Sequence, residues 1–294
     1  LIAVSASGAV LAPFIFGQIA DRLFATDKLL AVLHILGAVL MWFLDQFSSY
    51  WTLVVFGFLY SLLYFPTMAI GWIVVGIGMG QWILREYAHA GLPEVSGNAD
   101  SFKVAAVLGF AMGLYCLSLP STPPMPGAEK LAFAVAMKYV KRQPLITLFL
   151  VSFPVACIHQ FYFVHTADFL VAKQVATPWI DNIFGRGGGP MTIGQIAEIL
   201  VLAAIPVVAK RTTRKTLLAV GLLAYIARFA VFAYAPTAEF VYPALALHGL
   251  CFGCVFFVCF MIIDEETPND VRATAQSLFN LVIVGLGIIV GNYA

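Results

Sequence analysis

Composition and the spacing of apolar runs predict an all-α polytopic membrane protein. Of the 294 residues, 62% are hydrophobic and only 11% are charged, whereas ordinary soluble domains have about 25% charged residues. The mean hydropathy is +0.94. Apolar runs of roughly 20 residues, long enough to cross a bilayer as a helix, follow one another along most of the chain. A soluble fold of this length does not need so much apolar surface, so each run is interpreted as a membrane span.

Ten spans are predicted, separated by short polar segments or by segments containing Pro and Gly. Their approximate ranges are 1–20, 29–47, 51–70, 71–86, 102–119, 144–170, 190–209, 215–235, 240–263 and 274–294. The stretch from Trp51 to Leu84 is divided in two, because as one helix it would be about 51 Å long against a hydrocarbon core of about 30 Å. A connecting loop is expected to be missing near Ile70–Gly71.

A polar break divides these spans into five and five. It contains PSTPPMPGAEK and then LAFAVAMKYVKRQ, a pattern typical of a short amphipathic helix lying on a membrane surface. The predicted organisation is an N-terminal transmembrane bundle at 1–119, a cytoplasmic linker at 120–143 and a C-terminal transmembrane bundle at 144–294.

The distribution of Lys and Arg predicts the orientation of the chain in the membrane. One set of alternate loops, which includes the central break, holds 11 Lys and Arg residues, and the opposite set holds 4. Since cytoplasmic loops are the basic ones, the central break and the loop around Arg22 are placed in the cytoplasm. This assignment requires the division of the long apolar stretch described above.

Composition also excludes several classes of function. A net charge of +1 excludes a nucleic-acid binder driven by bulk charge, so no nucleic-acid partner is expected. The five cysteines lie in apolar runs, and Cys251 and Cys254 form a CxxC without a second pair or a nearby His cluster. They are interpreted as small packing residues. No metal site and no cofactor is predicted.

A glutamate in the middle of an apolar stretch is the strongest functional signal. Glu198 lies within MTIGQIAEILVLAAIPVV, and Gln195 lies one helical turn before it on the same face. A carboxylate in hydrocarbon costs roughly 2.5–3.5 kcal/mol on insertion scales, so such a residue usually faces a cavity or a partner. The pair is typical of a site for a polar solute that can also carry a proton. Alternatively, Glu198 forms a structural ion pair with Arg228, which also lies inside a span.

Two sets of motifs resemble known transporters. GQIADR, with Gly17, Asp21 and Arg22, resembles the cytoplasmic loop signature of the major facilitator superfamily, whose fold consists of two six-helix bundles. GQIAEILVLAAIPVV, then LLAYIARFAVFAYA, and then DEETPNDVRATAQ with Arg272 resemble the nucleoside:proton symporter family within that superfamily. The resemblance covers nearly all of the chain and would make its spans the second to eleventh of twelve. It implies structural or gating roles for Gly17, Asp21, Arg22, Arg272 and the intramembrane Arg228.

The resemblance also implies a set of substrate-binding residues in the C-terminal half. Gln195 and Glu198 match the amide and the acid of the family's eighth span, and Gln160 matches a polar residue of the seventh. A carboxylate and a carboxamide can bind the vicinal hydroxyls of a ribose, and Gln160 can hydrogen-bond to the edge of a nucleobase.

Aromatic residues complete the expected substrate site. His248 and Phe252 fall where the family places an aromatic pair on the tenth span, and Trp72 matches an aromatic residue of the N-terminal half. Stacking on such rings is worth about 1–3 kcal/mol per base in nucleic-acid binders. Two positions depart from relatives in ways that affect base selectivity, since Phe163 replaces an amide found in some and His248 replaces a Tyr. Gly253 replaces an acid carried by some relatives, so Glu198 and His248 are both candidates for the proton-coupling residue.

The function predicted is that of a secondary active transporter, a nucleoside symporter with the proton as its only coupling ion. It would be a monomer in the bilayer of the bacterial cytoplasmic membrane and would work by alternating access. A transporter of the same fold for another small polar solute, such as a sugar, is the alternative. An intramembrane enzyme is not expected, because the sequence has no HExxH, no paired membrane aspartates and no Ser with a His partner.

Overall fold

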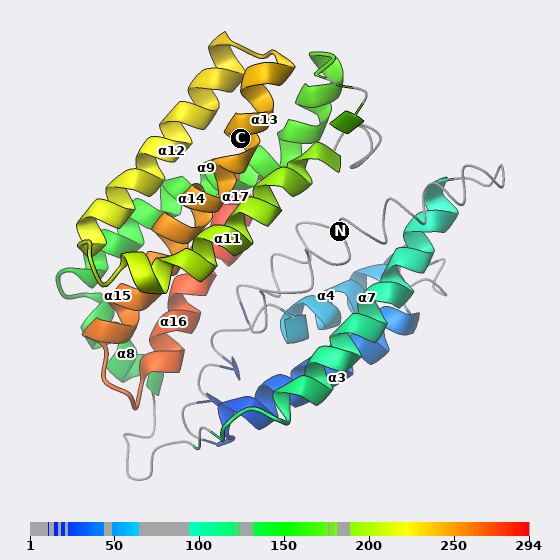
Figure 1. Ribbon diagram of the computed structural model, residues 1–294. Helices are drawn as coiled ribbons and strands as arrows, with labels where there is room; N and C mark the ends of the chain where they lie inside the picture. Colours follow the sequence, from blue (N-terminus) through cyan, green and yellow to red (C-terminus); the bar gives the residue numbers. More distant parts are fainter. Residues whose placement is uncertain are drawn as a thin grey trace. The chain divides into compact units, whose positions relative to one another are not determined.

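The computed structural model describes residues 23–43, 49–64, 94–121, 132–175 and 189–293, together with a few isolated residues outside these ranges. The regular elements of these ranges are all helices (Figure 1). They group into two compact units, residues 1–160 with 263–294 and residues 161–262. Helices α9 (Leu145–Ala172) and α15 (Val258–Glu266) each contribute to both units.

Small residues allow close helix packing in the first unit. Helix α3 (Thr26–Phe43) packs against α7 (Glu94–Cys116) and α4 (Tyr50–Tyr64). Gly109 and Gly113, one turn apart on α7, face α3, and a Cβ at Gly113 would lie 2.7 Å from Ile35 Cγ1 and 3.1 Å from the carbonyl oxygen of Ala31. Such small-xxx-small pairs are a common way for membrane helices to approach each other, because apolar surface alone gives no preference for a neighbouring helix over lipid.

Part of the predicted linker forms a helix, as its amphipathic pattern indicates. Helix α8 (Ala132–Val140) buries Ala132, Ala136 and Val140, which are spaced four residues apart on one face, and leaves Lys138 exposed. It packs against α16 (Arg272–Asn280). A short helix thus lies within the segment 120–143, whose role as a linker between two bundles stays a prediction.

The second unit is built around helices that meet at glycines. It contains α11 (Thr192–Val208), preceded by the 3₁₀ turn η5 (Gly189–Met191), and α12 (Arg214–Tyr234), whose first turn is capped by the Thr213 hydroxyl. The chain continues through α13 (Ala238–Ala246), α14 (His248–Cys251) and the π-helix η6 (Phe252–Phe257) into α15. Helices α11 and α12 both pack against α14 and η6.

Six described helices are long and apolar enough to cross a membrane. They cover Thr26–Phe43, Leu145–Ala172, Gly189–Val208, Arg214–Tyr234, Ala238–Glu266 and Arg272–Gly291, and each coincides with a predicted span. Large apolar side chains point outward from them, including Leu200, Leu223 and Ile226, each more than 60% exposed. Lipid contact accounts for such exposure, so the predicted polytopic membrane protein is confirmed.

The other four predicted spans have different outcomes. The span at 51–70 overlaps α4 up to residue 64, and its remainder lies outside the described residues. The span at 102–119 overlaps the shorter apolar helix Phe102–Cys116. Helix α7 begins earlier than predicted, at Glu94, because its polar first residues are also helical. The predicted spans at 1–20 and 71–86 lie mainly or wholly outside the described residues.

Two of the long helices contain π-helical segments. One is η6, and the other is η7 (Leu281–Leu286), between α16 and α17 (Gly287–Gly291). Helix α13 also contains Pro243, which lacks an N–H for the helical ladder. Apolar composition predicts the span at 240–263 but not these interruptions. π-Helical turns are frequent at functional sites, and η6 begins at the predicted site residue Phe252, one turn after His248.

Candidate functional site

Three helices of the second unit bring an acid, an imidazole and a guanidinium together. Arg228 on α12 approaches His248 on α14, with 2.9 Å between Nη1 and Nδ1. On the other side of the ring, His248 Nε2 lies 3.6 Å from Glu198 Oε2 on α11. The three side chains form a polar chain, Glu198–His248–Arg228, with His248 at its centre. Glu198 and Arg228 are therefore linked through the imidazole and do not form the direct ion pair that was the alternative from sequence.

The burial of the three side chains decreases from Arg228 to Glu198. Arg228 is fully buried and His248 is 1% exposed, while the Glu198 side chain is 20% exposed. A buried charge is stable only when polar or aromatic groups compensate it. Glu198 is therefore the most exposed of the three side chains, and Arg228 is the most buried.

Aromatic rings surround the guanidinium. Arg228 Cζ lies 3.9 Å from the ring centroid of Tyr162, 5.1 Å from that of Tyr225 and 5.3 Å from that of Phe229. Cation–π contacts are worth about 2 kcal/mol or more when they are desolvated. Two of its donor nitrogens, Nε and Nη2, have no hydrogen-bond partner within the described ranges. The rings, together with His248, therefore provide most of the compensation for this charge.

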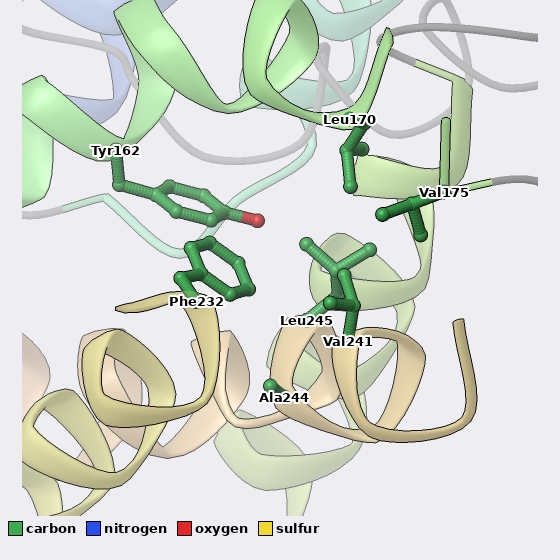
Figure 2. Close-up of a cluster of buried hydrophobic side chains, with 7 residues drawn as sticks. All are labelled: Tyr162, Leu170, Val175, Phe232, Val241, Ala244 and Leu245. Atoms are coloured by element: carbon green, nitrogen blue, oxygen red, sulfur yellow. The ribbon is translucent and has the colours of Figure 1, made fainter. Parts of the chain in front are cut away.

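Tyr162 connects the polar chain to the apolar core of the unit. Its ring stacks on His248 at 5.0 Å between centroids and on Phe232 at 6.4 Å. In Figure 2 its hydroxyl is directed toward Leu170 and Val175, and this buried oxygen has no hydrogen-bond partner in the described part of the chain. Sequence analysis did not select Tyr162. A buried arginine requires an aromatic or acidic neighbour, but the pattern does not say which of 11 Tyr and 25 Phe residues provides it.

Close approach of two helix backbones sets the distance between His248 and Glu198. A Cβ on Gly249 of α14 would lie 2.5 Å from the backbone carbon and oxygen of Ala197 and 2.7 Å from the backbone nitrogen of Glu198. A Cβ on Gly194 of α11 would lie 2.8 Å from His248 Cβ. Real Cβ atoms are not found so close to other atoms, so the two glycines are required for this geometry.

The structure also describes the other positions of this unit that sequence analysis singled out. Gln195 is half-buried and lies one turn before Glu198 on α11, as predicted. Phe252 opens η6, and its ring lies 5.9 Å from that of Phe256. Phe163, which replaces an amide of some relatives, meets His248 edge to face at 5.2 Å. A Cβ at Gly253 would lie 2.7 Å from Val201 Cγ1, so the position that carries an acid in some relatives is closely packed here.

Gln160 belongs to the first unit and has an intramolecular partner. Its side-chain amide donates to Asn292 Oδ1 at 3.0 Å. Gly291 permits this contact, because a Cβ there would lie 2.6 Å from the carbonyl oxygen of Cys157 and 2.7 Å from Gln160 Cβ. The predicted base-reading amide is thus held by a residue that sequence analysis did not select.

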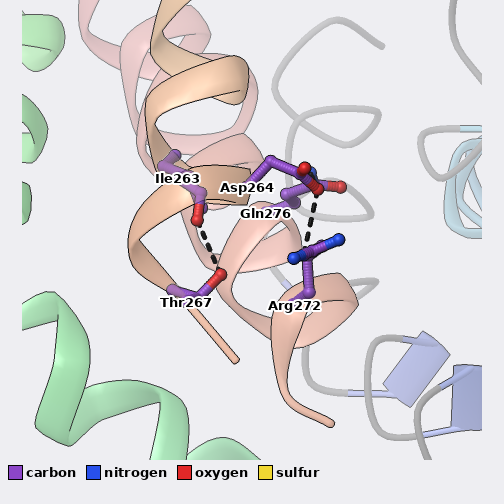
Figure 3. A network of polar contacts seen from close by, with 5 residues as sticks. All are labelled: Ile263, Asp264, Thr267, Arg272 and Gln276. Carbon is purple, nitrogen blue, oxygen red and sulfur yellow. Dashed lines mark hydrogen bonds and ion pairs between the residues drawn. The ribbon is translucent and has the colours of Figure 1, made fainter. Parts of the chain in front are cut away.

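Arg272, predicted to have a gating role, takes part in a polar network at the end of α15. Its Nε lies 3.0 Å from Asp264 Oδ1, and Gln276 reaches the same oxygen at 3.5 Å (Figure 3). The Thr267 hydroxyl donates to the carbonyl oxygen of Ile263 at 2.6 Å. The pair is half-exposed, so its contribution to stability is of the order of 0–1 kcal/mol.

Four predicted residues lie outside the described ranges: Gly17, Asp21, Arg22 and Trp72. Within those ranges no group of three or more His, Cys, Asp or Glu side chains could hold a metal ion. Cys251 and Cys254 are buried and free.

Comparison with known families identifies the chain. The model of the family described as Nucleoside H+ symporter matches residues 2–74 and 69–294. The chain belongs to this family. The two matched segments overlap at 69–74, the region where a missing loop is predicted.

Relatives of this nucleoside H+ symporter occur in Escherichia coli. YegT of strain K12, provisionally named as a nucleoside transporter, is 28% identical over 98% of this chain and 73% of its own length. The nucleoside permease NupG of the same strain is 22% identical, over 96% of this chain and 74% of its own length. A crystal structure of a NupG variant superposes with a TM-score of 0.66 at 21% identity, over 99% of this chain and 79% of that one. The symporter therefore has the major facilitator fold, as predicted.

Proposed function

We propose that this protein takes up nucleosides together with protons across the bacterial cytoplasmic membrane, and that Glu198 is the residue at which solute and proton meet. Membership of the nucleoside H+ symporter family supports the reaction. The observation that carries the site assignment is a partly exposed carboxylate inside a membrane helix, backed by a buried imidazole and a buried guanidinium.

The chemistry of the site fits a nucleoside. Glu198 and Gln195 lie one turn apart and together offer acceptors and donors to the two hydroxyls of a ribose. Gln160 offers an amide to the base edge, while Phe252 and Trp72 offer rings to its face. In this assignment His248 acts mainly through Glu198, because its ring is buried between Tyr162 and Phe163.

Transport follows from alternating access of the two halves. The transmembrane bundles at 1–119 and 144–294 rock about the site while the segment at 120–143 links them. Proton and solute binding at Glu198 together favour reorientation, and proton release to the cytoplasm then weakens solute binding. The Arg272–Asp264 pair stabilises one of the two states, as do Gly17, Asp21 and Arg22 in the loop after the first span. The protein works as a monomer in the lipid bilayer without a metal or an organic cofactor.

Uptake into proteoliposomes tests this proposal. Labelled uridine and adenosine are measured with and without an inward proton gradient, for the wild type and for Glu198→Gln. Glu239→Gln is the matched control, because it makes the same chemical change at an exposed position in the first turn of α13. We expect gradient-driven accumulation in the wild type and in the control, and its loss in Glu198→Gln. Full accumulation by Glu198→Gln would refute the assignment.

Competition separates a nucleoside from other solutes. A carboxylate with a neighbouring amide can also bind the hydroxyls of a free sugar, so a sugar transporter of the same fold is the alternative. Inhibition of uptake by nucleosides but not by ribose supports the proposed substrate. Inhibition by ribose at similar concentrations, or absence of nucleoside uptake by folded wild-type protein, would overturn it.

A further inference from the structure

The hydrogen bond between Arg228 and His248 has a defined direction. A guanidinium has five N–H donors, no acceptor and a proton that it does not lose in proteins. Its Nη1 lies 2.9 Å from His248 Nδ1. Nδ1 must therefore accept this bond with its lone pair and cannot carry a hydrogen while the bond exists.

The opposite side of the ring follows from the same contact. A neutral imidazole has one donor nitrogen and one acceptor nitrogen, so an accepting Nδ1 places the hydrogen on Nε2. That nitrogen is the one that lies 3.6 Å from Glu198 Oε2. His248 thus presents an N–H to the carboxylate, and the charge of Arg228 determines which tautomer does so.

A second proton on His248 conflicts with this arrangement. It would have to bind at Nδ1, where it would oppose an N–H of Arg228 and place two positive charges side by side. Arg228 has little freedom to withdraw, since it is fully buried and lies against the Tyr162 ring at 3.9 Å. Protonation of His248 would therefore require the guanidinium to leave its aromatic surroundings.

The other titratable groups near the ring do not replace Glu198 as a proton acceptor. Helix α9 contributes Tyr162, α12 contributes Tyr225 and α14 contributes Cys251. Phenols and thiols are neutral acids near pH 7, so they have no vacant site for a proton. In this cluster only the carboxylate of Glu198 can accept a proton without breaking the contacts that link Glu198, His248 and Arg228.

We propose that Arg228 locks His248 as the neutral Nε2–H tautomer, so that His248 is a positioning residue and Glu198 alone in this cluster binds the coupling proton. This inference deepens the proposed function. The tautomer of His248 does not rest on that function, whereas the coupling of the Glu198 proton to solute movement does. The inference also decides between the two proton-coupling candidates from sequence. At 3.6 Å the two atoms are beyond hydrogen-bond distance, so the His248 N–H attracts the ionised Glu198 carboxylate electrostatically. When Glu198 is protonated, this attraction to a negative charge is lost and the carboxyl is free to turn toward the solute.

Nitrogen-15 NMR of histidine-labelled protein in lipid nanodiscs tests the lock without any transport measurement. The chemical shifts of the two ring nitrogens report tautomer and charge, and the signal lost in His248→Gln identifies His248 among the five histidines. We expect a neutral Nε2–H ring over about pH 5–8, the range in which an unperturbed histidine titrates. Titration of wild-type His248 in that range, or the Nδ1–H tautomer, would overturn the proposal.

A variant that lacks the Arg228 hydrogen-bond donor provides a second NMR experiment. Arg228→Met keeps a long apolar side chain but has no donor for Nδ1. We expect His248 to titrate within the same pH range in this variant. A ring that stays neutral in Arg228→Met would show that burial keeps it neutral without Arg228, which also contradicts the lock.

Transport variants test the assignment of the proton. In His248→Gln, the amide oxygen can accept from Arg228 and the amide nitrogen can donate to Glu198, which reproduces the locked tautomer in a side chain that cannot titrate. We expect His248→Gln to keep gradient-driven accumulation, and His248→Leu, which offers neither group, to lose most of it. If folded His248→Gln loses the gradient dependence but still equilibrates solute, His248 carries the proton and the proposal fails. If wild-type protein transports no nucleoside, the proposed function fails, while the NMR result still decides the lock.

Discussion

The backbone contact at Gly249 allows a quantitative prediction for Gly249→Ala. The added Cβ would lie 2.5 Å from Ala197 carbon and oxygen, where ordinary contacts begin at 3.4 Å, a shortfall of 0.9 Å. The obstructing atoms belong to the backbone of α11, so no rotamer change can relieve the contact. Helices α11 and α14 must therefore separate locally or rotate.

This separation of α11 and α14 changes the distance between Glu198 and His248. Because Glu198 follows Ala197 and His248 precedes Gly249, a displacement of this size moves Nε2 and Oε2 from 3.6 Å to about 4.5 Å apart, while overpacking costs about 1–3 kcal/mol. At that distance the imidazole no longer positions the carboxylate. We expect Gly249→Ala to lower both the unfolding temperature and the proton-driven uptake rate.

Two measurements check this prediction, thermal unfolding in detergent and initial uptake rates in proteoliposomes. Gly37→Ala is the control, since its Cβ would meet no atom closer than 3.8 Å, and replacing a helical Gly by Ala gains about 0.5–1 kcal/mol. Gly249→Ala protein with the stability and uptake rate of the wild type would refute the argument that this backbone approach sets the site.

Three further predictions concern individual contacts. Tyr162→Phe removes a buried hydroxyl without a described partner, so we expect unfolding free energy to stay constant or rise by up to about 1 kcal/mol, whereas Tyr162→Leu should lose the cation–π contact and about 2 kcal/mol or more. Asn292→Leu takes the acceptor from Gln160 and should cost about 1–3 kcal/mol in a chemical denaturation experiment. Asp264→Asn weakens an exposed pair with Arg272 and should change stability by less than about 1 kcal/mol, so a large fall in its initial uptake rate would report a gating role.

Much of the fold can be predicted from sequence, because a membrane helix is a continuous apolar run of a defined length. Hydropathy and length alone place the spans at 190–209 and 215–235 within one residue of the helices Gly189–Val208 and Arg214–Tyr234. The π-helix at Phe252–Phe257 is not predictable in this way, because a change of hydrogen-bond register leaves composition unchanged.

The site shows the same division between local and non-local information. The helical spacing of Gln195 and Glu198 is local, and the structure places them one turn apart on α11. The position of His248 between Glu198 and Arg228 depends on how closely two helices approach. That distance is set by Gly194 and Gly249, which are 55 positions apart in the sequence. No periodic pattern of residues indicates how closely the two helices approach.

The bond between Gln160 and Asn292 has a consequence for selectivity. The amide donates one of its two N–H groups to Asn292 at 3.0 Å, which leaves the other N–H and the carbonyl oxygen for a further partner. Because the bonded N–H fixes the plane of the amide, a flip that exchanges its nitrogen and oxygen would break this bond. In the proposed site, Asn292 would therefore fix the direction in which Gln160 presents its donor and its acceptor to a base.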